Sequence, residues 1–168
     1  MTAMGDRFGG PGCKLAQGWR LKHLVPPSRL HGANGIRTGA DGRIYVAQLA
    51  GCRVSAVDPD TAAIEHLTTS GSQILGPDDL VFDDAGNMYI TEFTEHRVSV
   101  RGPNGASRIL QGDIPCANPI TFHDGHLLAG ECKPDARILE LDRNGGAPRV
   151  IASGIPMVNA FEVGPDGR

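Results

Sequence analysis

Short apolar runs separated by turn residues make up most of this chain. Three of the runs, Ile44 to Ala47, Met88 to Thr91 and Leu127 to Ala129, are nearly continuous rather than alternating. Strands that are buried on both faces have such runs. Gly, Asp, Asn and Pro cluster between the runs, as tight hairpin turns require. No stretch has the period of a long amphipathic helix, so the pattern predicts an all-β chain.

The pattern of runs and turns repeats along the sequence. The repeats begin at Asn34, Asp78, Asn118 and Asn159, which lie 44, 40 and 41 residues apart. This spacing fits a four-stranded propeller blade, whose period is about 40–45 residues. A β-sandwich does not need internal repetition. The sequence therefore predicts a β-propeller fragment with three complete four-stranded blades and the start of a fourth.

The repeat also predicts the domain boundaries. Complete blades are expected near residues 31–72, 73–113 and 114–154, and residues 155–168 would begin the next blade. Because this last blade stops just after a hairpin turn, strand edges would be open, and the chain is expected to self-associate through them. A fragment of a longer protein is favoured over an assembly of two copies.

Residues 1–30 lie outside the repeat. The part before Gly18 is rich in glycine and is expected to be disordered. Trp19 to Val25 alternates like a strand and ends at Pro26-Pro27. This strand could close a ring by pairing with the last blade.

Composition and charge narrow the classes of function. With a formal net charge of −3 and 21% charged residues, the chain is not expected to carry a basic patch for nucleic acid. No apolar run approaches the roughly 20 residues that cross a membrane, and the N-terminus lacks the apolar core of a secretory signal. The four cysteines form no C-x-x-C pair, so a zinc site is not expected. Reduced thiols in a cytoplasmic protein are the simpler expectation.

Oxygen-bearing side chains recur at the ends of the predicted inner hairpins. Counted outward from each turn, the residues expected to face each other are Asn34 and Gln48, Asp78 and Glu92, and Asn118 and Glu131. Asn159 repeats the first position. A single Asn or Asp here often caps a turn, but capping needs no partner opposite. The repeated pairing favours a ring of donors over the central channel, of the kinds that Ca²⁺ binds.

Other catalytic signatures are missing from the sequence. It has neither a G-x-S-x-G nucleophile elbow nor a phosphate-binding glycine loop. His31 is the best-placed histidine, three residues before Asn34, whereas the other histidines are expected at the surface or in turns. Cys132 directly follows Glu131 and could lie near the channel mouth, but a buried, inert thiol is the stronger expectation.

Two segments resemble a known family. They are Pro77 to Glu92 (PDDLVFDDAGNMYITE) and Ala117 to Phe122 (ANPITF). They resemble the family of senescence marker protein-30 (regucalcin), gluconolactonase and luciferin-regenerating enzyme, over about residues 30 to 168. The resemblance implies a six-bladed parent propeller, one divalent cation in the channel, most often Ca²⁺, and a small sugar-type lactone as the substrate of a hydrolase.

The resemblance also implies roles for individual residues. The family's metal-binding Asn falls at Asn118, and its Pro-Asn-Asp-Leu motif is here Pro77-Asp78-Asp79-Leu80. Asn34 and Asn159 are neutral where the family has Glu and Asp. The metal ligands are then expected to be Asn34, Asp78, Asn118 and Asn159.

Other roles concern the substrate, and Asp78 is a candidate for one of these as well as for the metal. Asp78 or Glu92 is expected to be the general base. The residues expected to contact the lactone are Gln48, Glu131 and His31. The repeats also resemble streptogramin lyases and non-catalytic binding propellers, and both alternatives stay open.

Overall fold

The computed structural model describes residues 15–22, 24, 25, 30–68 and 74–167, and within them the regular structure is twelve β-strands. The first four strands are β1 (Ala33–Thr38), β2 (Ile44–Gln48), β3 (Arg53–Val57) and β4 (Ile64–His66). The next four are β5 (Pro77–Phe82), β6 (Met88–Glu92), β7 (Arg97–Arg101) and β8 (Ser107–Gln111). The last four are β9 (Ala117–His123), β10 (His126–Glu131), β11 (Ala136–Leu141) and β12 (Arg149–Ile155). The described residues contain no helix that is long and apolar enough to span a membrane.

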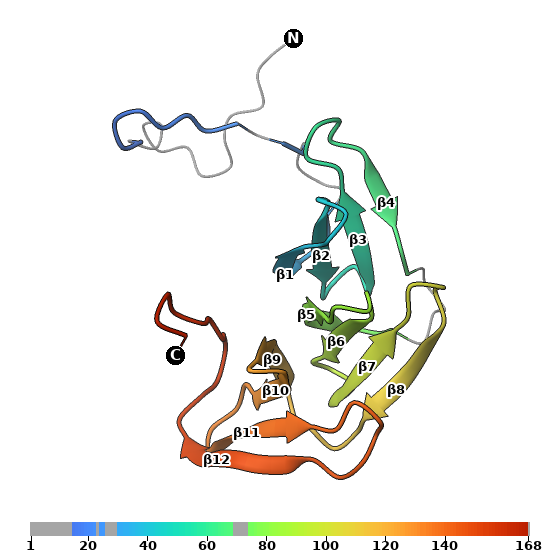
Figure 1. Ribbon diagram of the computed structural model, residues 1–168, viewed down its shortest axis with the longest axis vertical. Helices are drawn as coiled ribbons and strands as arrows, with labels where there is room; N and C mark the ends of the chain where they lie inside the picture. Colours follow the sequence, from blue (N-terminus) through green and yellow to red (C-terminus); the bar gives the residue numbers. More distant parts are fainter. Residues whose placement is uncertain (1–14, 23, 26–29, 69–73, 168) are drawn as a thin grey trace.

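Each group of four strands is one antiparallel sheet in which neighbours in sequence are neighbours in space. Figure 1 shows the three sheets in an arc, with β1, β5 and β9 on its inner side and β4, β8 and β12 on its outer side. The hairpin turns contain Gly42, Gly86 and Gly125, all with φ between 78° and 79°, which glycine adopts without strain. This all-β arrangement of three four-stranded blades confirms the predicted propeller fragment.

The blades pack on one another through two apolar layers. Tyr45, Val54 and Leu80 belong to the layer between the first and second blades. Ile120 and Leu139 belong to the layer between the second and third blades. The central strands are therefore covered on both faces, as their continuous apolar runs predicted.

Two expected strands are missing from the described residues. Residues 19–22, 24 and 25 belong to no strand, so the strand predicted for Trp19 to Val25 is not formed there. Residues 159–167 also belong to no strand, so the fourth blade expected from Asn159 onward is not formed in the described residues. Val158 instead packs on Gly130 and donates its N–H to the Glu131 carbonyl oxygen at 3.2 Å. Residues 1–14, expected to be disordered, lie outside the described residues.

Candidate functional site

A β-bulge recurs near the start of the innermost strand of each blade. Two residues on that strand lie opposite one residue of the next strand: Asn34 and Gly35 in β1, Asp78 and Asp79 in β5, and Asn118 and Pro119 in β9. A bulge bends the strand and changes the direction of its side chains, and it tolerates a proline that a regular ladder would not. Asn34, Asp78 and Asn118, which begin the repeats, are therefore bulge residues, and their side chains do not follow the alternation of a regular strand.

Because of the bulges, the pairs of residues predicted to face each other across the inner hairpins are wrong: the actual register differs by one residue. Gln48, Glu92 and Glu131 lie opposite Ala33, Pro77 and Ala117 instead of Asn34, Asp78 and Asn118. A shift of one residue moves a side chain to the other face of a strand. The predicted oxygen donors thus form two separate rows. We call Asn34, Asp78 and Asn118 the bulge row, and Gln48, Glu92 and Glu131 the bracket row.

The side chains of the bracket row are fully buried and make hydrogen bonds within their own blades. Gln48 accepts a bond from the His31 backbone N–H at 2.7 Å and donates one to Ser55 Oγ at 2.6 Å. Glu92 makes the equivalent contacts with the Leu75 backbone N–H at 2.7 Å and with Ser99 Oγ. These side chains tie the segment entering each blade to its third strand.

The two acids of the bracket row also have cationic partners. Arg97 Nη2 lies 2.8 Å from Glu92 Oε2. Arg137 bonds Glu131 through its backbone N–H at 3.0 Å and through its guanidinium, and Lys133 Nζ lies 3.3 Å from Glu131. Burial would raise the pKa of Glu131, but the Arg137 hydrogen bonds outweigh it and hold the pKa below its usual value. The expected substrate and base roles of Gln48, Glu92 and Glu131 therefore conflict with where these side chains lie.

Asp78 of the bulge row is in the opposite electrostatic situation. The residue is only 3% exposed, and Asn34 Nδ2 donates a hydrogen bond to its Oδ2 at 2.9 Å. Burial and the neighbouring Asp79 charge raise its pKa to about 6, although the Asn34 bond acts to lower it. Among the described residues, no Lys, Arg or His forms an ion pair with Asp78. A buried carboxylate of this kind is typical of functional sites.

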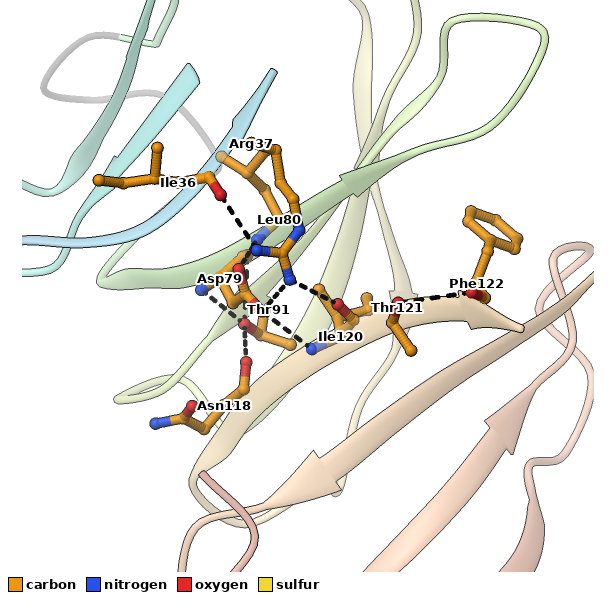
Figure 2. Close-up of polar contacts among 9 residues, drawn as sticks. All are labelled: Ile36, Arg37, Asp79, Leu80, Thr91, Asn118, Ile120, Thr121 and Phe122. Atoms are coloured by element: carbon orange, nitrogen blue, oxygen red, sulfur yellow. Dashed lines mark hydrogen bonds and ion pairs between the residues drawn. The ribbon is translucent and has the colours of Figure 1, made fainter. Parts of the chain in front are cut away.

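Asp79 links the inner strands of all three blades. Its Oδ2 accepts hydrogen bonds from Arg37 Nη2 of β1 at 3.1 Å and from the Ile120 N–H of β9 at 3.2 Å. Thr91 of β6 receives the Asp79 N–H at 2.9 Å and bonds the Asn118 carbonyl oxygen at 2.6 Å. Figure 2 shows these contacts as one network. The network fixes the bulges of β5 and β9 against each other.

This network was not predicted from the sequence. Arg37, Asp79 and Thr91 belong to three different strands, and Arg37 and Asp79 are 42 residues apart. The second Asp of Asp78-Asp79 was a usable signal, because two adjacent acids beside a buried strand need a compensating cation. Burial raises the pKa of Asp79, and Arg37 counteracts that rise.

The other predicted site residues are only partly brought together. Asn118 is 7% exposed, and Figure 2 shows its amide directed away from the Asp79 network; the described residues offer that amide no hydrogen-bond partner. Asn159 is exposed on the segment after β12. His31 is exposed and uses its backbone, not its ring, to contact Gln48.

The donors that could hold a divalent cation are few. In the part of the chain that the structure describes, no three His, Cys, Asp or Glu side chains cluster as metal ligands. The bulge row offers the Asp78 carboxylate, the Asn34 amide that is hydrogen-bonded to it, and the Asn118 amide at the equivalent position of the next blade. Ca²⁺ takes six to eight oxygen ligands and accepts carboxamides and water among them. These residues therefore fit one side of such an ion.

Comparison with known proteins supports the architecture. No protein-family model and no curated protein matches this sequence. Among solved structures, virginiamycin B lyase from Staphylococcus aureus is similar with a TM-score of 0.66 and 17% identity, over 83% of this chain and 48% of that one. The chain folds as β-propeller blades.

Two further solved structures extend the comparison. A putative gluconolactonase has a TM-score of 0.67 and 15% identity, over 82% of this chain and 56% of that one. A structure of a nidogen/laminin complex has a TM-score of 0.68 and 14% identity, over 78% and 52%. The chain thus spans about half the length of each neighbour. At these identities, the likeness shows a shared fold.

Proposed function

We propose that this chain carries the acid–base centre of a divalent-cation-dependent hydrolase that opens a small sugar-type lactone. The observation behind the proposal is Asp78, which is buried, has a pKa raised to about 6 and, among the described residues, has no cationic partner. The likeness to a putative gluconolactonase and to a lyase favours an enzyme on this fold.

Asp78 would act as the general base on a water molecule. With a pKa of about 6 it is ionised at neutral pH, yet it is a stronger base than an ordinary aspartate. The Asn34 amide, bonded to Oδ2, would hold the carboxylate in one orientation. Arg37 balances the charge of Asp79, which leaves Asp78 as the carboxylate that can take up a proton.

A Ca²⁺-like cation would be held beside this base by the bulge row. Asp78 and Asn118 would supply ligands, with Asn34 and Asn159 as further candidates. When bound, the cation supplies the polarisation of the lactone carbonyl. The bracket row takes no part in this proposal, because Gln48, Glu92 and Glu131 bond inside their own blades.

A binding propeller is the second candidate. The nidogen/laminin neighbour matches the chain as well as the enzymes do. The small number of charged donors near Asp78 also suits a propeller that presents its surface to a partner and needs no catalytic cation.

Asp78→Asn separates the two candidates. In the purified protein, calcium affinity by calorimetry should fall at least about 10-fold, and kcat/KM for D-glucono-δ-lactone should fall roughly 100-fold or more, as expected for loss of a general base. Because protonated Asp78 can neither bind a cation nor accept a proton, wild-type kcat/KM should fall below about pH 6, and added calcium should move this midpoint lower.

The matched control is Asp84→Asn, which removes an exposed carboxylate from the turn of the same hairpin. It should leave both measurements unchanged. Lactone turnover that is equal in wild type and Asp78→Asn would rule out the hydrolase proposal. Absence of calcium binding and of turnover in wild type would favour the binding propeller.

A further inference from the structure

Cys116 occupies a backbone position that is glycine in the other two blades. Gly32, Gly76 and Cys116 lie 44 and 40 residues apart, and all three have positive φ, of 62°, 53° and 52°. Each accepts a hydrogen bond through its carbonyl oxygen at the open end of the inner hairpin, at 2.9–3.1 Å. A residue with a Cβ is strained in this conformation, so a cysteine at this position calls for an explanation.

A second cysteine stands directly opposite the first. Cys132 donates its backbone N–H to the Cys116 carbonyl oxygen at 2.9 Å. With standard peptide dimensions, this bond keeps the two Cα atoms within about 7 Å of each other. The usual separation in a disulfide is about 4.4–6.8 Å. The next pair along the ladder, Ala117 and Glu131, confirms that the two cysteines face each other across the hairpin.

Both thiols are reduced and partly accessible to solvent, so the expectation that Cys132 is buried is wrong. His96 holds the strained backbone in place, because its Nδ1 accepts the Cys116 N–H at 2.9 Å. Burial raises the pKa of Cys132, with smaller contributions from the Asp78 charge and from Cys116. The two cysteines directly flank the ladder pair Ala117 and Glu131, and the bulge at Asn118 follows that pair. The cysteine pair therefore lies at the same end of the third blade as the bulge row.

We infer that Cys116 and Cys132 form a dithiol site that a small-molecule disulfide, such as oxidised glutathione, closes into a reversible disulfide bond. One cysteine thiolate attacks the reagent, forms a mixed disulfide and releases one glutathione thiolate. The other cysteine thiolate attacks the protein-bound sulfur and releases the second. The two thiols are oxidised by two electrons while the reagent is reduced by two, so the reaction balances. This site does not depend on the proposed hydrolase function.

Peptide mapping of the full chain tests the site. The folded protein is incubated with oxidised glutathione, free thiols are blocked with N-ethylmaleimide, and the protein is cut before aspartate residues. Cys116 then lies in peptide 113–123 and Cys132 in peptide 124–134. The two peptides should be recovered joined, at least about tenfold above any other cysteine pairing, because only thiols within disulfide reach close without backbone movement.

Two variants keep the test decisive. Cys52→Ser removes an exposed thiol in the first blade and should leave the cross-link unchanged. Cys116→Gly restores the residue of the other blades, should keep the β-sheet circular dichroism spectrum, and should leave Cys132 alkylated or joined to glutathione. Recovery of Cys116 and Cys132 on separate alkylated peptides in the wild type, or joined mainly to Cys13 or Cys52, would overturn the inference.

Discussion

The buried acids of the bulge row and of the bracket row differ in their charged partners. Glu92 and Glu131 of the bracket row are fully buried, and each has an arginine within hydrogen-bond distance. Asp78 of the bulge row is almost as buried, but the charge that acts on its pKa is that of another carboxylate, Asp79. The two rows start only one residue out of register. One bulge thus separates acids that stabilise a blade from an acid that does not.

The difference bears on the proposed function. A buried ion pair whose hydrogen bonds are all made fixes one geometry, and its loss is costly. A buried carboxylate without a cation destabilises the native state, and such groups are found where a proton or a metal must be bound. On this argument, the bracket row maintains the blades, and the bulge row is where chemistry would occur.

Removing an acid from the bracket row should have the largest effect. Glu92→Ala leaves Arg97, Ser99 and the Leu75 N–H without their common acceptor. We expect the free energy of unfolding to fall by about 3–5 kcal/mol, measured by urea denaturation at neutral pH. Ser99→Ala, which removes one of these contacts, should lower it by only about 1 kcal/mol. Equal losses in the two variants would contradict the bracket role of Glu92.

Removing the acid from the bulge row should stabilise the protein. The pKa of Asp78 is 3.8 when unfolded and about 6 when folded, so the native state binds the extra proton between these values. The proton on Asp78 therefore contributes its full stabilisation to the native state below about pH 4, and this contribution is lost as the pH rises through about 6. With a discount for partial solvation, Asp78→Asn should raise the free energy of unfolding at pH 8 by about 1–3 kcal/mol. The slope between pH 4 and 6 should flatten.

Glu131→Gln is the matched control, with the opposite sign. The folded pKa of Glu131 is lowered, so its stabilisation is present above the unfolded pKa of 4.5 and lost as the pH falls through the folded pKa. The variant should therefore be less stable than wild type at pH 8. If Asp78→Asn also lowered the free energy of unfolding at pH 8 and left its pH dependence between pH 4 and 6 unchanged, the proposed difference between the two rows would be wrong.

The fold was predictable because its signals are local and repeated. Apolar runs such as Ile44 to Ala47 and turns such as Asp41-Gly42 depend on neighbouring residues alone, and a fixed period links them into blades. The strands expected at Trp19 to Val25 and after Asn159 are not formed in the described residues. Their local pattern resembles that of the other strands, but a strand also needs a partner beside it, which a local pattern does not show.

The site was only half predictable. Counting from the turns located Asn34, Asp78 and Asn118, but it assumed a regular ladder, and the extra residue of each bulge put Gln48, Glu92 and Glu131 on another face. Gly35 and Pro119 are hints of a bulge, since glycine inside a strand often marks one and proline is tolerated in one, whereas Asp78-Asp79 has no such signal. Cys116 was detectable, because the same repeat aligns it with Gly32 and Gly76.

Cys116→Gly should change the free energy of unfolding least. It tests whether Cys116, like Asp78, is a residue that destabilises the native state at this end of the blades. Glycine relieves the strain of a Cβ at φ 52°, worth about 1–2 kcal/mol, but it makes the unfolded chain more flexible, which costs about 0.5–1 kcal/mol. We expect a net gain of about 0.5 kcal/mol in urea denaturation under reducing conditions. The reverse change, Gly76→Ala, should destabilise by more than about 1 kcal/mol, because its Cβ would lie 2.3 Å from Thr94 Oγ1. A loss of more than about 1 kcal/mol in Cys116→Gly would show that the thiol is a packing residue and that the strained position beside the bulge row is stabilised by its side chain.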